Sequence, residues 1–303
     1  MFVDMLTQDE VQFDEPMSKH TTIKIGGPAD ALVTPKSLES LEKTCRWARS
    51  EKIDLFVLGG GSNILVRDGG IRGVVIKLTR CANDIQITSE DESGTHLYIG
   101  AGLKMPSLIQ YAIKEGLTGI EPLVGIPSTV GGAVVMNAGT PDGTIGDILE
   151  YVVFLNPEGE LVKEFRDQLE LGYRSCKIPK GHFVLGVGLK LKRGDSEGIA
   201  TTVRQRIDKR NSTQPLSLPN LGCIFKNPAK REAGSLIEEA GLKEVRIGGA
   251  RVSGQHANFI VNEGGGKARD VLALVSLIKD KVRERFGIAL ETEIKVVGED
   301  ELT

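Results

Sequence analysis

The sequence predicts a protein of mixed α/β or α+β class with two domains, or three, and three observations support this. Short apolar runs alternate with segments of helical periodicity along the chain. The 303 residues correspond to two or three domains at roughly 100 to 200 residues each. The stretch Lys192–Gly198 is polar and contains glycine, which indicates a domain boundary near residue 195.

Two helices are predicted before that boundary. Ser37 is a candidate N-cap for a helix in which Leu38, Leu41, Cys45 and Ala48 recur at helical spacing. A second helix begins at Pro106, a residue favoured in the first turn, and Gly116 ends it. Apolar runs bounded by turn residues predict strands at Leu55–Leu58, Ile64–Val66, Val74–Leu78, His96–Gly100, Tyr151–Leu155, Leu161–Phe165 and Phe183–Leu191.

The part after residue 195 has its own pattern of elements. A polar helix is expected near 199–211, and a short helix at 233–240 is ended by Gly241. An apolar strand follows at Asn258–Val261. The expected last elements are a long helix with one apolar face, carrying Val271, Leu274, Val275, Ile278 and Val282, and a strand near 289–297.

Composition excludes several classes of function. There are 38 Lys and Arg against 41 Asp and Glu, with no long run of either sign, so we expect no nucleic-acid or anionic-membrane partner. The stretch Met1–Glu10 lacks the pattern of a signal peptide, and no apolar stretch is long enough to span a membrane, so we expect a cytoplasmic protein. Four scattered cysteines and four histidines predict neither a metal site nor a disulfide framework.

Glycine is in excess, at 37 residues, or about 12% against an average of about 7%. Thirteen glycines fall within 55–73 and 119–146, where they serve either tight turns or close approach to a ligand. In the first window a predicted strand leads into Gly59-Gly60-Gly61-Ser62-Asn63. This sequence is a candidate anion cradle, because its backbone N–H groups and two polar side chains can surround a phosphate. A plain tight turn is the alternative.

The second window holds Gly125–Gly139, a run of small residues too apolar for a solvent-exposed loop. It indicates a segment pressed against a flat ligand or buried between strands, and a close-packed core crossing is the alternative. The cluster Gly264–Gly266 lacks the spacing of a phosphate-binding loop and is interpreted as a turn before the long helix.

Three further residues have ordinary explanations when taken singly. Arg174 follows Gly172-Tyr173, and most arginines are solvated. Cys223 lies between a loop rich in Pro and Gly and an apolar pair, where an inert buried thiol is the default. Glu293 shares one face of the predicted last strand with Glu291 and Lys295, which is typical of a solvated face.

Taken together, the segments resemble the UDP-N-acetylenolpyruvoylglucosamine reductase family over nearly the whole chain, from His20 to the last strand. Each motif is weak alone, but their shared order is specific. The gap between Pro228 and Ala233 is similar to the shorter form of the enzyme, which lacks a tyrosine loop over the substrate. The matching segments are GGGSN at 59–63, GIPSTVGGAVVMNAG at 125–139, GYRSC at 172–176, GCIFKNP at 222–228, AGLKEVRIGGARVSGQHANFIVN at 240–262 and LETEIKVVG at 290–298.

The resemblance implies an α+β fold: a terminal segment at 1–20, a FAD-binding domain of the vanillyl-alcohol-oxidase type in two subdomains at 21–194, and a substrate-binding domain at 195–303. It implies that hydride from NADPH reaches the enolpyruvyl group of a UDP-sugar through non-covalent FAD, in peptidoglycan precursor synthesis. By similarity Arg174 and Glu293 stabilise the charge that develops on the substrate, and Cys223 donates a proton. The family often has serine at that last position.

The resemblance also assigns the binding residues. Ser128 departs from the family's usual glycine, and a serine would be strained there if the backbone required positive φ. The implied FAD-binding residues are Gly59, Gly60, Gly61, Ser62, Asn63, Ile126, Pro127, Ser128, Thr129, Gly131, Gly132, Asn137 and Ala138. The candidate substrate contacts are Lys226, Asn227, Gln255, His256 and Lys295.

Two other functions remain open from the residues. A FAD-dependent oxidase or dehydrogenase with the same fold fits the glycine-rich segments but leaves Arg174, Cys223 and Glu293 unexplained. A non-catalytic flavin- or nucleotide-binding module is the alternative from a different class. The sequence does not predict the oligomeric state.

Overall fold

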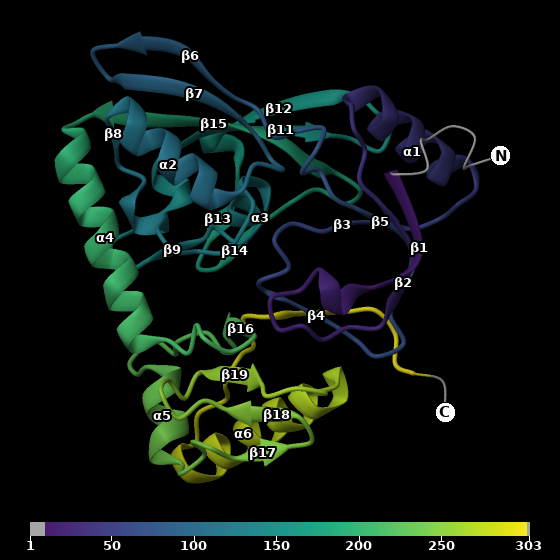
Figure 1. The fold of residues 1–303 in the computed structure, drawn as a ribbon, viewed down its shortest axis with the longest axis vertical. Helices are drawn as coiled ribbons and strands as arrows, with labels where there is room; N and C mark the ends of the chain where they lie inside the picture. The colour runs from purple at the N-terminus through teal and green to yellow at the C-terminus, as the bar shows by residue number, and fades with distance from the viewer. Residues whose placement is uncertain (1–9, 302–303) are drawn as a thin grey trace. The chain divides into compact units, whose positions relative to one another are not determined.

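The computed structural model describes residues 10–301 (Figure 1). The first nine residues of the predicted terminal segment lie outside this range. The chain divides into two compact units, and each is built from separate stretches of sequence. Within the described residues, unit 1 comprises 10–12, 31–60 and 73–209, and unit 2 comprises 13–30, 61–72 and 210–301.

An antiparallel sheet forms the centre of unit 1 (Figure 1). Its strands run in the order β12-β11-β15-β7-β6, and β8 (Leu117–Thr118) pairs with the far end of β15. Buried and half-buried residues alternate along β7, as in a sheet with one face on the core. The strand bounds are β6 Ile85–Asp91, β7 Gly94–Gly100, β11 Leu149–Leu155, β12 Leu161–Phe165 and β15 Phe183–Arg193.

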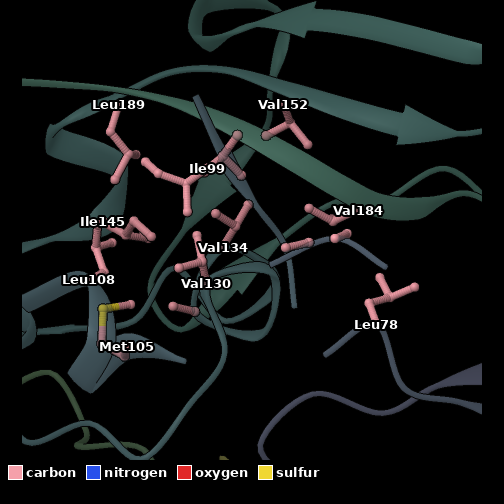
Figure 2. Close-up of a cluster of buried hydrophobic side chains, with 14 of the residues drawn as sticks. Leu78, Ile99, Met105, Leu108, Val130, Val134, Ile145, Val152, Val184 and Leu189 are labelled. Atoms are coloured by element: carbon pink, nitrogen blue, oxygen red, sulfur yellow. The ribbon is translucent and has the colours of Figure 1, made fainter. Parts of the chain in front are cut away.

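Helices α2 (Met105–Glu115) and α3 (Val130–Val135) cover one face of this sheet. Figure 2 shows their apolar side chains, among them Leu108 and Val134, directed towards Ile99 of β7 and Val152 of β11. All four residues are at most 1% exposed, so this is the core of unit 1. Helix α1 (Leu38–Ser50) adds Leu41 to the same core.

A second sheet has the order β1-β2-β5-β3, with β1 Val11–Pro16, β2 Pro28–Val33, β5 Ile71–Ile76 and β3 Leu55–Val57. Its strands β3 and β5 are parallel. Unit 1 also holds two short hairpins: β9 (Gly139–Thr140) with β10 (Gly143–Thr144), and β13 (Leu171–Gly172) with β14 (Ser175–Cys176).

Unit 2 has a separate core. An antiparallel sheet in the order β16-β19-β18-β17 packs against helices α5 (Ala233–Glu239) and α6 (Ala268–Phe286) (Figure 1). A parallel pair joins β4 (Ile64–Val66) to β20 (Lys295–Val297). The bounds of the sheet are β16 Asn220–Cys223, β17 Arg246–Ile247, β18 Ala250–Val252 and β19 Phe259–Asn262.

The two units divide the chain differently from the boundary expected near residue 195. That position lies at the start of α4 (Ser196–Thr213), whose buried residues Ile199 and Val203 belong to the core of unit 1. The contacts therefore pass to unit 2 only after Lys209. The polar loop at 192–198 was expected to separate the domains. Helix α4 after this loop instead joins unit 1, because Ile199 and Val203 pack into the core of that unit.

The last strand is shorter than predicted. Residues 289–294 form no ladder beyond a single bridge between Thr292 and Phe225, and regular pairing starts only at Lys295. Leu290 and Ile294 are both buried and four residues apart, which places them on the same face of an extended chain, so the segment keeps the burial of a strand without its ladder. None of the helices within residues 10–301 combines the length and the apolar composition that a membrane span requires.

Candidate active site

The loop Gly59–Asn63 follows β3 and has free backbone donors. Within residues 10–301 no hydrogen bond is formed by the backbone N–H groups of Gly59, Gly60, Gly61 or Ser62. A β-carbon on Gly60 would lie 2.6 Å from the carbonyl oxygen of Pro127, and one on Gly59 would lie 3.0 Å from Thr129 Oγ1. These two glycines therefore permit close approach of two backbone segments, in addition to exposing N–H groups.

The segment 126–138 holds α3, a short helix that was not predicted. Thr129 caps it by accepting a hydrogen bond from the backbone N–H of Gly132 at 3.3 Å. Val130, Ala133 and Val134 are fully buried, so most of this run is a core crossing, as one of the two interpretations expected. Ser128 is not among the residues with positive φ, so the strain considered for a serine there is absent.

Arg174 lies on the β13–β14 hairpin of unit 1. Gly172 pairs with Ser175, which leaves Tyr173 and Arg174 as a two-residue turn. Arg174 has a left-handed backbone with φ 55°, and its guanidinium lies 5.4 Å from the centroid of the exposed Tyr173 ring. The side chain of Arg174 is partly buried, so it is not the freely solvated arginine that is most common.

Asn137 contacts this hairpin from the end of α3. Its Nδ2 donates to the carbonyl of Gly172 at 3.0 Å, and its Oδ1 accepts from the N–H of Gly146 at 3.1 Å. Asn137 also has a left-handed backbone, with φ 39°. Both ends of its amide are thus engaged within unit 1.

Cys223 ends β16 in unit 2, where it pairs with Phe259 of β19. The thiol is half-buried, and the preceding Gly222 has φ 75° with no atom within 4 Å of the place where a β-carbon would be. Arg210, near the end of α4, interacts electrostatically with Cys223, and burial lowers the pKa of the Arg210 guanidinium. Nothing in the sequence marks Arg210, because a basic residue in a polar helix is normally solvated.

The other cysteines differ from Cys223 in their environment. Burial raises the pKa of Cys45 and of Cys81 to about 11, and it also raises the pKa of Cys176. These three thiols are therefore poor nucleophiles near neutral pH.

A backbone hydrogen bond joins the segment of Glu293 to the segment that follows Cys223. The N–H of Glu293 donates to the carbonyl of Ile224 at 2.8 Å, and its own carbonyl accepts from Asn63 Nδ2 at 3.1 Å. The carbonyl of Asn63 in turn accepts from the N–H of Lys295 at 2.9 Å. Unit 2 thus brings together Asn63, Cys223, Glu293 and Lys295 from three distant parts of the sequence.

Three of the predicted substrate contacts have structural partners. The Asn227 side chain accepts from the N–H of Ala233 at the start of α5, at 3.0 Å. Gln255 Nε2 donates to the carbonyls of Asn211 and Ser212 at the end of α4. His256 Nδ1 accepts from the N–H of Asn258 at 3.2 Å, and burial lowers its pKa.

Lys226 is placed differently. Its backbone N–H donates to the carbonyl of Glu291, and its Nζ lies 3.5 Å from the carboxylate of the same residue. The side chain of Glu291 is 79% exposed, so water screens this pair and leaves the ammonium available to an anion.

Comparisons with known proteins agree along the whole chain. Residues 29–164 match the FAD binding domain family, and residues 214–297 match the family described as UDP-N-acetylenolpyruvoylglucosamine reductase, C-terminal domain. The reductase of that name from Desulfosudis oleivorans is 43% identical over 96% of both chains. That from Clostridium tetani is 40% identical over 99% of this chain and 96% of its own. The crystal structure of the reductase from Thermus caldophilus, 39% identical, superposes with a TM-score of 0.78 over 95% of this chain and 98% of its own.

Proposed function

Because this chain belongs to the UDP-N-acetylenolpyruvoylglucosamine reductase family, we propose that Arg174, Cys223 and Glu293 carry its reaction and that NADPH is its reductant. The chain is a FAD-dependent oxidoreductase that reduces the enolpyruvyl group of UDP-N-acetylglucosamine enolpyruvate, a step of peptidoglycan precursor synthesis. The α+β fold, with a FAD-binding domain followed by the family's C-terminal domain, agrees with the expectation from the sequence. A cytoplasmic location stays a prediction.

The residues of the first glycine window fit a dinucleotide. Four consecutive N–H groups, from Gly59 to Ser62, have no partner in the part of the chain that the structure describes, and this is the donor pattern that a phosphate requires. Gly59, Gly60, Gly61, Ser62 and Asn63 would hold the FAD pyrophosphate. The second set would line the bound FAD, and it consists of Ile126, Pro127, Ser128, Thr129, Gly131, Gly132, Asn137 and Ala138. Bound FAD supplies a carrier that accepts hydride from NADPH and passes it to the substrate.

Arg174 and Glu293 stabilise the negative charge that develops on the substrate carboxylate as hydride is added. A guanidinium offers several N–H donors in a fixed plane, which suits a carboxylate. Such preorganised charge is the largest single contribution in many enzymes, because it need not reorganise during the reaction. Glu293 shares a hydrogen bond or a proton with the same carboxylate.

Cys223 then donates the proton that completes the reduced product. A thiol has an ordinary pKa of about 8.5, so it is a stronger acid than the serine hydroxyl often found at this position. The proposal is supported chiefly by the hydrogen bond from the backbone N–H of Glu293 to the carbonyl of Ile224, because this bond brings the backbone of Glu293 next to the segment that carries Cys223.

Cations and amides near Cys223 would bind the rest of the substrate. Lys226 and Lys295 supply positive charge for the diphosphate. Asn227, Gln255 and His256 already make hydrogen bonds within unit 2, so any contact to substrate would use their remaining donors or acceptors.

Stopped-flow spectroscopy of Cys223→Ala tests the proposed donor. Flavin reduction by NADPH should keep its wild-type rate, because the thiol takes no part in it, while product formation falls by about a hundredfold or more. Cys223→Ser is the matched control and should retain substantial turnover, because its hydroxyl can donate the same proton. Unchanged product formation in Cys223→Ala would remove the thiol from the mechanism. A purified protein that is colourless and takes up no FAD would contradict the flavin function itself.

A further inference from the structure

The Arg174 turn has a conformation that its own sequence does not favour. Two-residue hairpin loops prefer turn types with a left-handed first residue, because their twist matches that of the strands. Here only the second residue, Arg174, is left-handed, and that position favours glycine or asparagine. A strained backbone of this kind persists only where the surroundings hold it.

Asn137 supplies such a support. Its Nδ2 donates to the carbonyl of Gly172, the residue that begins the turn, at 3.0 Å. Its other end is fixed by the N–H of Gly146 at 3.1 Å. Asparagine tolerates the left-handed conformation that Asn137 adopts, and its amide can donate and accept at once. Alanine neither tolerates the left-handed backbone nor forms these hydrogen bonds. Aspartate tolerates the left-handed backbone but has no N–H group to donate to Gly172.

We propose that Asn137 is a positioning residue for Arg174, acting on the substrate step through the β13–β14 hairpin. This rests on the proposed role of Arg174. The amide fixes the carbonyl of Gly172 and thereby fixes the turn, so the guanidinium is held before the substrate arrives. A displacement of about 1 Å in such a group can slow a reaction on the order of a hundredfold.

Asn137→Asp removes the donor to Gly172 and keeps the acceptor for Gly146. Asn137→Gly is a second variant, which allows the same backbone and removes both hydrogen bonds without adding charge. For each variant we would measure flavin reduction by NADPH and flavin reoxidation by UDP-N-acetylglucosamine enolpyruvate in separate stopped-flow experiments. We expect reoxidation to slow at least tenfold and by far more than reduction, since Asn137 also belongs to the set proposed to line FAD.

A double-mutant cycle with Arg174→Ala distinguishes positioning from a direct role. If Asn137 acts through Arg174, the Asn137 variants add no further loss of reoxidation once Arg174 is absent. Equal slowing of reoxidation in both backgrounds, or a loss in flavin reduction as large as the loss in reoxidation, would overturn the inference and leave Asn137 with a role at the cofactor alone. If Arg174→Ala alone left reoxidation unchanged, the proposed role of Arg174 would fail, and the inference would fail with it.

Hydrogen–deuterium exchange gives a readout that needs no turnover. Peptides covering residues 171–176 should exchange faster in both Asn137 variants, and unchanged exchange there would overturn the inference. Asn156→Asp is the matched control, because Asn156 braces the β11–β12 turn in the same way, donating to Glu160 and accepting from its N–H. That variant should leave the exchange of residues 171–176 and both flavin steps unchanged.

Discussion

Gly60 occupies a position where the surrounding backbone leaves no room for a side chain. Its φ is not positive, so the requirement for glycine comes from the nearby backbone of Pro127 and Ser128. Gly60→Ala should therefore displace the loop and weaken FAD binding by about tenfold or more, since the free N–H groups would move away from the phosphate that they are proposed to hold. Titration of the apoprotein with FAD, followed by fluorescence, measures this. Gly198→Ala, at a helical glycine near only the flexible Asp195, should bind FAD like the wild type.

Arg210 is expected to control the reactivity of Cys223. A cation near a thiol favours the thiolate, which is the form that reacts, so removing Arg210 should slow the alkylation of Cys223 at a fixed pH. We expect iodoacetamide to modify Cys223 several-fold more slowly in Arg210→Met at pH 7.5, as measured by mass spectrometry. The high pKa of Cys45 and Cys81 keeps them from interfering.

Arg204→Met provides the control for this experiment, because it removes an exposed arginine from the same helix. Its alkylation rate should equal that of the wild type. An equal decrease in both variants would indicate a general effect of charge on α4 and would contradict a specific role for Arg210.

At the residue scale the catalytic residues stay a prediction. Arg174, Cys223 and Glu293 were singled out only through the order of six motifs, because each has an ordinary explanation alone. The sequence did not reveal that Asn137 contacts Gly172, because the pairing depends on a hairpin of only four paired residues. Such short strands have no periodicity that a sequence pattern can show.

At the scale of elements, helices were predicted best where their ends carry a chemical signal. Ser37 accepts from Ser40 at the start of α1, and Gly116 adopts the left-handed conformation after α2. In contrast, β6 was not predicted, because six of its seven residues are exposed and polar side chains obscure the alternation. Helix α3 was missed because glycine and valine are weak helix formers, and tertiary packing overrides their propensity.

His96 connects two strands that lie on either side of β15. Its Nδ1 lies 2.9 Å from the carboxylate of Glu150 on β11, and its Nε2 lies 3.2 Å from Asp91. The hydrogen bond with Glu150, and then the negative charges of Glu150 and Asp91, raise the pKa of His96 above its ordinary value of 6.5. A raised pKa in the folded state stabilises the protein below about pH 6.5, and the contribution is lost as pH rises through the raised value.

His96→Gln should therefore lower the melting temperature most at acidic pH. We expect the difference from the wild type to be largest near pH 5.5 and to shrink towards pH 9, in a series of thermal melts. His182→Gln should give a difference that does not follow this trend, because the ring of His182 contacts no carboxylate within residues 10–301. A difference for His96→Gln that grew with pH would contradict the assignment.

At the scale of the whole molecule, unit 2 is assembled from three stretches of chain. Ile23, Ile25 and Leu65 are buried in its core, far in sequence from the residues after 210. A fragment spanning 195–303, the domain expected from the sequence, lacks these residues and the strand that pairs with β20. We predict that it unfolds without a cooperative transition by circular dichroism and binds a hydrophobic dye.

Adding residues 13–30 and 61–72 to that fragment through short linkers should restore a cooperative melt, since it supplies the missing core. A fully cooperative transition in the 195–303 fragment alone would contradict this account. The sequence could not predict that unit 2 is built from three stretches, because the apolar pattern of 23–25 and 64–66 does not indicate which of the two cores these residues join.

The parallel pair of β4 and β20 bears on how the protein is made. Ile64–Val66 leaves the ribosome long before its partner in that pair, Lys295–Val297, is synthesised. Until then this apolar segment is a strand edge without that partner, which is the kind of surface that promotes aggregation. We therefore expect transient contacts or a chaperone to cover this edge of the newborn chain, and the hydrogen bonds that join Asn63 to Glu293 and Lys295 form only after it is covered.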